Sequence, residues 1–95
     1  CKRAGVEVEK VNLFEINDAF AAVALANARL LDIDFLQDMN VHGGAIALGH
    51  PIGASGARIV GTLAKSIEQK EANVGGASIC NGGGGASAIV LRRIK

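Results

Sequence analysis

The chain has few aromatic residues and almost no net charge. It contains three Phe, no Trp and no Tyr, and its formal net charge at pH 7 is +1. With so few aromatic rings it offers no platform on which nucleic-acid bases would stack. Without a basic excess it has no electrostatic footprint for phosphate backbones or anionic membranes. We therefore expect neither a nucleic-acid partner nor a membrane partner.

Cysteine is also scarce. The two cysteines, Cys1 and Cys80, lie near opposite ends of the sequence, so no disulfide framework is expected, which fits a reducing compartment. No basic start with an apolar run and a cleavage site is visible. The last residues, Arg92 to Lys95, do not match a peroxisomal signal. We expect a cytoplasmic protein, with the mitochondrion as the alternative.

Apolar residues, by contrast, are abundant for so short a chain. Hydrophobic residues make up 49% of it, and the mean hydropathy is +0.32. Its 95 residues form one small domain at most, and a domain of that size buries a modest share of its surface. We expect the excess to cover a surface shared with further chain or with a partner subunit. Because the sequence begins at Cys1 rather than Met, we interpret it as a fragment of a larger protein.

The first half of the sequence predicts a strand followed by a helix. Residues 11–16 form a short apolar run typical of a buried strand. Residues 19–31 are rich in Ala and lack Gly and Pro, which favours a helix. This helix is apolar nearly all round and is therefore expected to be buried. Asn17 or Asp18 would cap its first amides.

The second half predicts a helix and a hairpin. An amphipathic helix is expected after Pro51. Its apolar face consists of Ile59, Val60, Leu63, Ala64 and Ile67. Residues 77–80 and 86–91 read as two antiparallel strands joined by a glycine run. The order of elements indicates an α/β layered domain that ends in an antiparallel pair.

Glycine is concentrated in two stretches that carry almost no charge. Twelve of the 13 glycines lie in residues 43–61 or 75–85, and Arg58 is the one charged residue between Asp38 and Lys65. Because such segments suit an open surface badly, we expect both to lie inside, facing each other or a ligand.

Three polar residues stand beside glycines or at the ends of predicted elements, namely Asn17, His50 and Cys80. Each has a structural interpretation and a catalytic one. Asn17 is either a helix cap or a site residue, and His50 is either a loop histidine bonded to the backbone or a proton-transfer group. Cys80 is either an inert small hydrophobe or a reactive thiol. His42, on the apolar approach to the same loop, is interpreted as structural.

The spacing of the residues excludes several familiar site motifs. A Walker A loop needs Lys after its last glycine, whereas Gly49 is followed by His50. The glycine run 82–85 leads into a predicted strand, which excludes a dinucleotide fingerprint. Neither zinc-ligand spacing nor a G-x-S-x-G elbow around Ser55 is present. What remains is a histidine and a cysteine suited to acyl transfer, in either a Cys–His hydrolase or a thioester enzyme.

Three segments together resemble the thiolase family. Asn-Asp-Ala-Phe-Ala at 17–21 resembles its NEAF motif, residues 43–58 are similar to its GHP loop, and Cys-Asn-Gly at 80–82 resembles its C-x-G motif. They occur in the family's order and spacing and cover nearly the whole chain. Asp18 departs from the pattern, because the family usually has Glu there.

The resemblance implies a layered α/β thiolase fold with a mixed sheet, in which residues 1–95 form the C-terminal portion of the second core domain. It implies Claisen condensation of two acyl-CoA units, or the reverse thiolysis, with the acyl-carrying cysteine outside this chain. Residues 79–88 are most similar to acetoacetyl-CoA thiolases, that is, acetyl-CoA C-acetyltransferases. The alternatives are a 3-ketoacyl-CoA thiolase of broader chain length and, for the isolated chain, a non-catalytic association module.

Site roles also follow from the resemblance. His50 would activate the absent nucleophile and help bind the thioester oxygen, and Asn17 would hold a water that completes that oxyanion site. Cys80 would move a proton to and from the second acyl-CoA. The Gly82 amide would stabilise the tetrahedral oxyanion.

The remaining implications concern ligands and assembly. Ala19 and Phe20 would line the pantetheine channel. Coenzyme A thioesters would be substrates, with no cofactor and no metal. The full-length protein would be a homodimer or homotetramer.

Overall fold

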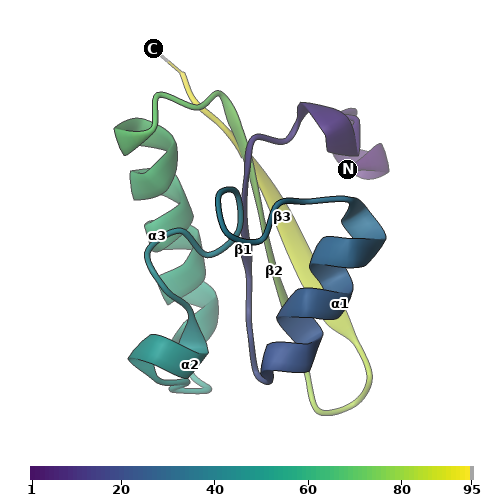
Figure 1. The fold of residues 1–95 in the computed structure, drawn as a ribbon, viewed down its shortest axis with the longest axis vertical. Coiled ribbons are helices and arrows are strands. Elements are labelled where there is room, and N and C mark those ends of the chain that lie inside the picture. Colours follow the sequence, from purple (N-terminus) through teal and green to yellow (C-terminus); the bar gives the residue numbers. More distant parts are fainter. Residues whose placement is uncertain (95) are drawn as a thin grey trace.

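A mixed three-stranded sheet forms the middle of the structure, a computed structural model that describes residues 1–94 (Figure 1). β1 (Leu13–Ile16) pairs in parallel with β2 (Val74–Cys80), which pairs antiparallel with β3 (Ala86–Arg92). The predicted α/β class, mixed sheet and terminal hairpin are therefore confirmed.

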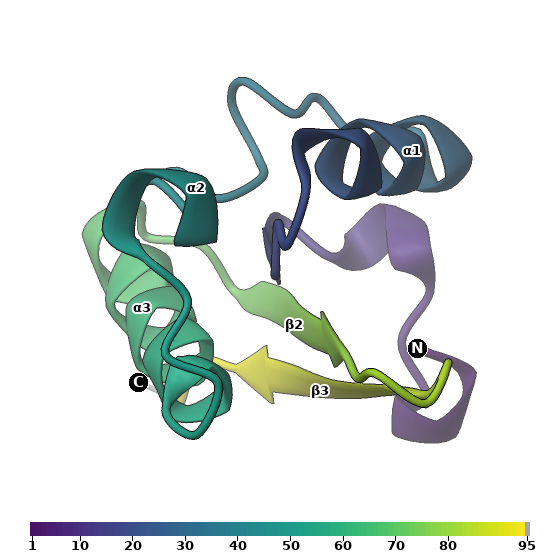
Figure 2. The same cartoon turned by 90° about the horizontal axis from the view of Figure 1, so that it is seen from below.

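Helices cover the two faces of this sheet. Figure 2 shows α1 on one side of the strands and α3, with the short α2, on the other. The α-helices are α1 (Ala21–Leu31), α2 (Ala45–Leu48) and α3 (Ser55–Gln69), and two 3₁₀ turns, η1 (Lys2–Ala4) and η2 (Val8–Lys10), precede β1.

The face toward α3 is closely packed. A buried stripe repeats every fourth residue along the helix, through Ser55, Ile59, Leu63 and Ile67, as expected for residues on one helical face. Its apolar members pack against β1 and β2, and a Cβ at Gly75 would overlap Leu63 and Ile67. The predicted apolar face of this helix is confirmed at those three positions.

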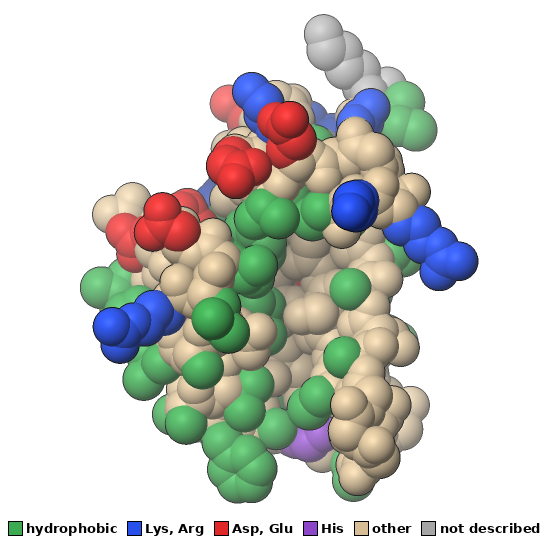
Figure 3. All heavy atoms as spheres, turned by 90° about the vertical axis from the view of Figure 1, so that its right-hand side faces the viewer, with side chains coloured by type: hydrophobic (Ala, Val, Ile, Leu, Met, Phe, Trp, Pro, Cys, Tyr) green, Lys and Arg blue, Asp and Glu red, His purple; other side chains and the backbone are tan. Residues whose placement is uncertain are grey.

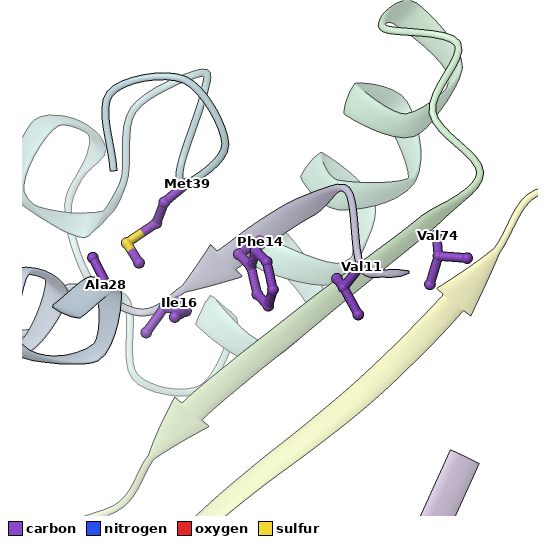
Figure 4. Close-up of a cluster of buried hydrophobic side chains, with 6 residues drawn as sticks. All are labelled: Val11, Phe14, Ile16, Ala28, Met39 and Val74. Atoms are coloured by element: carbon purple, nitrogen blue, oxygen red, sulfur yellow. The ribbon is translucent and has the colours of Figure 1, made fainter. Parts of the chain in front are cut away.

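The face toward α1 holds a second hydrophobic cluster. Phe14 and Ile16 of β1 alternate with the residues that face α3, as the strand period requires. Figure 4 shows the members of this cluster, which are Val11, Phe14, Ile16, Ala28, Met39 and Val74.

The prediction that the Ala-rich helix is buried is wrong for this chain. Ala28 is the one buried residue of Ala21–Leu31, and the Leu25 and Leu30 side chains are 50% and 83% exposed. α1 rests on the sheet by one face, and no further layer among residues 1–94 covers the other. Hydrophobic side chains accordingly spread over the face of the molecule that carries α1 (Figure 3).

The predicted cap of α1 is also wrong. The helix begins at Ala21 after an extended Phe20, without a side-chain hydrogen bond at its cap. Neither side chain bonds an amide of α1: the Asn17 side chain has no partner among the described residues, and the Asp18 carboxylate accepts from the amides of Ala45 and Ile46 instead.

The two glycine-rich stretches were expected inside, and much of each lies on the surface. Residues 46–54 and 80–89 are exposed, because nothing within residues 1–94 packs over them. No helix in that range is long and apolar enough to cross a membrane.

Candidate active site

Asn17, His50 and Cys80 all lie toward one end of the sheet. β1 and β2 are parallel, so their carboxyl ends share an edge. The backbone N–H of Asn17 donates to the carbonyl of Ser78 at 2.9 Å. Because Ser78 is two residues before Cys80, this bond places Asn17 beside the end of β2. The first turn of α3 lies at this same end (Figure 1). The fold therefore brings the three predicted motifs to one region.

The orientation of His50 is set by Ser55. His50 is exposed, and its Nδ1 lies 2.6 Å from the Ser55 hydroxyl oxygen, whose residue is fully buried at the start of α3. This bond occupies Nδ1 and leaves Nε2 as the ring nitrogen for a reaction. The sequence immediately around Ser55 was informative only in excluding a G-x-S-x-G nucleophile. The place of Ser55 on the four-residue stripe of α3 was the signal that it is buried.

Asn17 is a buried amide with free hydrogen-bonding capacity. The side chain is 2% exposed, and neither its oxygen nor its nitrogen has a partner among the described residues. Since buried polar groups in native proteins are nearly always satisfied, this favours a site residue over a cap. The end of β1 that carries it is held by Asn40, whose side chain bonds the Ile16 amide and carbonyl, each at 2.9 Å.

Cys80 ends β2 as an exposed free thiol. The hairpin after it is ordered by Asn81, whose Oδ1 accepts hydrogen bonds from the amides of Gly83 and Gly85, each at 3.0 Å. Within residues 1–94 the Gly82 amide has no acceptor, so it remains available as a donor. The sequence places Asn81 in the hairpin connection, where an Asn before a glycine run is a recognised turn signal, and the structure adds the two hydrogen bonds by which it orders the turn.

Asp18 anchors the loop that carries His50. Its carboxylate accepts hydrogen bonds from the amides of Ala45, at 2.5 Å, and Ile46, at 3.4 Å. These amides begin α2, which leads directly into the loop. A Cβ at Gly44 would overlap this carboxylate, so the contact requires glycine there.

Two ionisable side chains near the site, Glu15 and Arg58, have buried polar atoms without a partner among the described residues. Glu15 of β1 is 1% exposed and has no hydrogen-bond partner among the described residues. Burial raises the pKa of Glu15 to about 7, the nearby Arg58 charge lowers it and the Asp18 charge raises it further. The Nε and Nη1 atoms of Arg58 are likewise buried without a partner in that range.

Apolar side chains surround this end of the molecule. Phe20 is 73% exposed and follows a half-buried Ala19, while Leu48 and Ile52 on the loop around His50 are 59% and 85% exposed. His42 is exposed too. Among residues 1–94 no three His, Cys, Asp or Glu side chains gather closely enough to hold a metal ion.

Residues 1–93 match the family model described as Thiolase, C-terminal domain. A probable acetyl-CoA acetyltransferase of Dictyostelium discoideum is 57% identical over 93 residues, covering 98% of this chain and 22% of that protein. A mitochondrial acetyl-CoA acetyltransferase of Rattus norvegicus is 55% identical, with 98% and 21% covered. A cytosolic one of Gibberella zeae is 51% identical, with 99% and 24% covered. The chain spans less than a quarter of these relatives, and it belongs to the thiolase family.

Proposed function

We propose that this chain is the C-terminal portion of the second core domain of an enzyme that condenses two acetyl-CoA into acetoacetyl-CoA, or catalyses the reverse thiolysis. The observation that supports this proposal is that the ends of β1 and β2, next to which Asn17 and Cys80 lie, and the start of α3, where Ser55 bonds His50, are at the same end of the fold. The relatives' names support acetyl-CoA as the substrate. Family membership favours thioester chemistry over a Cys–His hydrolase.

The first step is acyl transfer to the nucleophilic cysteine outside this chain. His50 takes the proton of that cysteine, the thiolate attacks the thioester of one acetyl-CoA, and CoA leaves with the proton.

Proton transfer at carbon follows. The Cys80 thiolate removes a proton from the α-carbon of the second acetyl-CoA, and negative charge develops on its thioester oxygen. His50 Nε2–H and a water held by Asn17 donate hydrogen bonds to that oxygen. Loss of one such donor typically lowers the rate about 10²- to 10³-fold.

Carbon–carbon bond formation follows. The carbanion attacks the acetyl thioester on the nucleophilic cysteine, which lies outside this chain, and the tetrahedral oxyanion forms at the Gly82 amide. Collapse expels that cysteine as thiolate and releases acetoacetyl-CoA. In the reverse direction Cys80 returns the proton to carbon, and His50 activates the nucleophile.

The surroundings of the site suit a long thioester substrate. Ala19 and Phe20 would line the pantetheine channel together with the exposed loop side chains. No resident cofactor or metal is needed for these steps, since the thioester itself activates the α-carbon.

Exposed apolar surface supports a larger assembly. The exposed face of α1 would be covered by the rest of the full-length chain. The full-length protein would assemble as a homodimer or homotetramer. We propose a cytoplasmic location, with the mitochondrion as the alternative, because relatives carry both descriptions.

The test is Cys80→Ser in the full-length protein that carries this chain. We expect condensation to be lost while the nucleophilic cysteine still accepts an acetyl group, detected by mass spectrometry. Cys1→Ser is the matched control, because Cys1 is also an exposed free cysteine but lies outside every motif. Undiminished condensation in Cys80→Ser, or acylation of Cys80 itself by a simple ester, would contradict the proposal.

A further inference from the structure

The peptide unit that joins Ile16 to Asn17 is held at both of its polar atoms. Its N–H donates to the carbonyl of Ser78 on β2 at 2.9 Å. Its carbonyl oxygen accepts a hydrogen bond from Nδ2 of Asn40, also at 2.9 Å. Because a peptide unit is planar, these two bonds fix the plane from which the Cα of Asn17 extends.

The side chain of Asn40 takes the place of strand backbone in this contact. The preceding residues pair with β1 as a parallel strand would, since the Phe14 N–H donates to the Asp38 carbonyl and the Asn40 N–H donates to the Phe14 carbonyl. A continued parallel ladder would next join Ile16 to the carbonyl of residue 40 and the N–H of residue 42. Instead, Oδ1 of Asn40 accepts from the Ile16 N–H and Nδ2 donates to the Ile16 carbonyl, each at 2.9 Å.

The backbone of Asn40 does not make these bonds because the chain turns there. Asn40 has a φ of 48°, in the left-handed region that Asn adopts more readily than most residues. Its carbonyl accepts from the Gly43 N–H at 2.9 Å, so it is committed to the turn that leads toward α2 and the His50 loop. The side chain of Asn40 is therefore what holds the end of β1 from this side.

Asn17 depends on its backbone for its orientation. Its side chain is 2% exposed, and neither of its polar atoms has a hydrogen-bond partner within residues 1–94. The direction of this amide is accordingly set by the peptide that carries it and by packing, rather than by a bond of its own.

We propose that Asn40 is a positioning residue of the condensation, because it fixes the peptide that carries Asn17. The inference rests on the proposed function, in which Asn17 holds the water that donates to the developing oxyanion. Both side-chain bonds of Asn40 go to Ile16, so Asn40 acts through Asn17 and not on the substrate. It affects the carbanion steps and spares acylation of the nucleophilic cysteine, in which Asn17 has no part.

The experiment is Asn40→Gly in the full-length protein, alone and combined with Asn17→Ala. Glycine adopts a positive φ freely, so this variant removes the two side-chain bonds and keeps the turn. We expect kcat for condensation to fall about 10- to 100-fold, since small misplacement of a catalytic group has effects of that size. The rate at which acetyl-CoA acetylates the nucleophilic cysteine, followed by mass spectrometry, stays nearly constant. In the Asn17→Ala background, Asn40→Gly lowers kcat no further, because the group that it positions is absent.

Asn12→Gly is the matched control. Oδ1 of Asn12 accepts hydrogen bonds from the N–H groups of Asn73 and Val74, each at 3.1 Å. This variant therefore also removes two bonds between an Asn side chain and the backbone, at the other end of β1. We expect the unfolding midpoint to fall in both glycine variants, and kcat to fall in Asn40→Gly alone.

A second variant, Asn40→Asp, keeps the result decisive if Asn40→Gly does not fold. Aspartate preserves the shape and the acceptor for the Ile16 N–H but has no donor for the Ile16 carbonyl, so the same loss of kcat is expected. An unchanged kcat, a parallel loss of cysteine acetylation, or a full further loss in the Asn17→Ala background would overturn the inference alone. Absence of condensation in the unmodified protein would instead overturn the proposed function, and the inference with it.

Discussion

His50 Nδ1 and the Ser55 hydroxyl oxygen lie 2.6 Å apart, and Ser55 continues the buried stripe of Ile59, Leu63 and Ile67. An exposed loop histidine is thereby fixed to the hydrophobic core through a single hydrogen bond. Since the loop is otherwise exposed from residue 46 to 54, this bond and the Asp18 anchor are the contacts that orient the imidazole.

Ser55→Ala tests the first of these contacts. In the full-length protein we expect kcat to fall about tenfold or more, because a ring without its Nδ1 partner loses its fixed orientation and tautomer. The measurement is kcat for acetoacetyl-CoA cleavage together with the unfolding midpoint. Ser66→Ala is the control: Ser66 is also buried in α3, and its hydroxyl donates to the Thr62 carbonyl at 2.8 Å. Equal kcat values for the two variants would contradict the assigned role of Ser55.

Glu15 makes stability depend on pH. Its folded-state pKa is raised from 4.5 to about 7, so the folded state binds the proton more tightly than the unfolded state does. Its stabilising contribution is full below about pH 4.5 and is lost as the pH rises through about 7.

Glu15→Gln should remove this dependence. The free energy of unfolding of the unmodified protein, relative to the variant, is expected to fall by about 2 kcal/mol between pH 5 and 8. Denaturant unfolding of both proteins at the two pH values measures it, and the comparison cancels every other titrating group. The predicted direction would be contradicted if the free energy of unfolding of the unmodified protein, relative to Glu15→Gln, were larger at pH 8 than at pH 5.

The fold elements could be read from the sequence because their signals are local. The four-residue repeat of Ile59, Leu63 and Ile67 indicates a helix face wherever the rest of the chain lies. A glycine run between two short apolar segments likewise predicts a hairpin. The site motifs were found in the same way, as short segments in a fixed order.

Contacts between residues distant in sequence could not be predicted from such local patterns. Asp18 before an Ala-rich segment looks like the cap of the next helix, yet it holds amides 27 and 28 residues away at the start of α2. The prediction that α1 is buried was wrong for a related reason. An all-round apolar helix indicates that something covers it, and residues 1–94 do not include that cover.

Gly44→Ala tests the Asp18 anchor. The added Cβ would overlap the carboxylate, so we expect a loss of about 1–3 kcal/mol of stability. Gly61→Ala is the control, because its Cβ would meet open space within α3, where alanine favours the helix by about 0.5–1 kcal/mol. Thermal unfolding of both variants measures the contrast. Similar midpoints for the two would show that the anchor contributes little.

The isolated chain should be inactive. In the proposed function the acyl-carrying cysteine lies outside these 95 residues, and the exposed apolar side chains of α1 favour association with further protein. We therefore expect no acetoacetyl-CoA cleavage by the chain alone and recovered cleavage when it is mixed with the remainder of the full-length protein. A Cys80→Ser chain is the control, because it should associate equally well without restoring turnover. Cleavage by the chain alone would show that it supplies its own nucleophile, and mass spectrometry of the acylated residue would identify it.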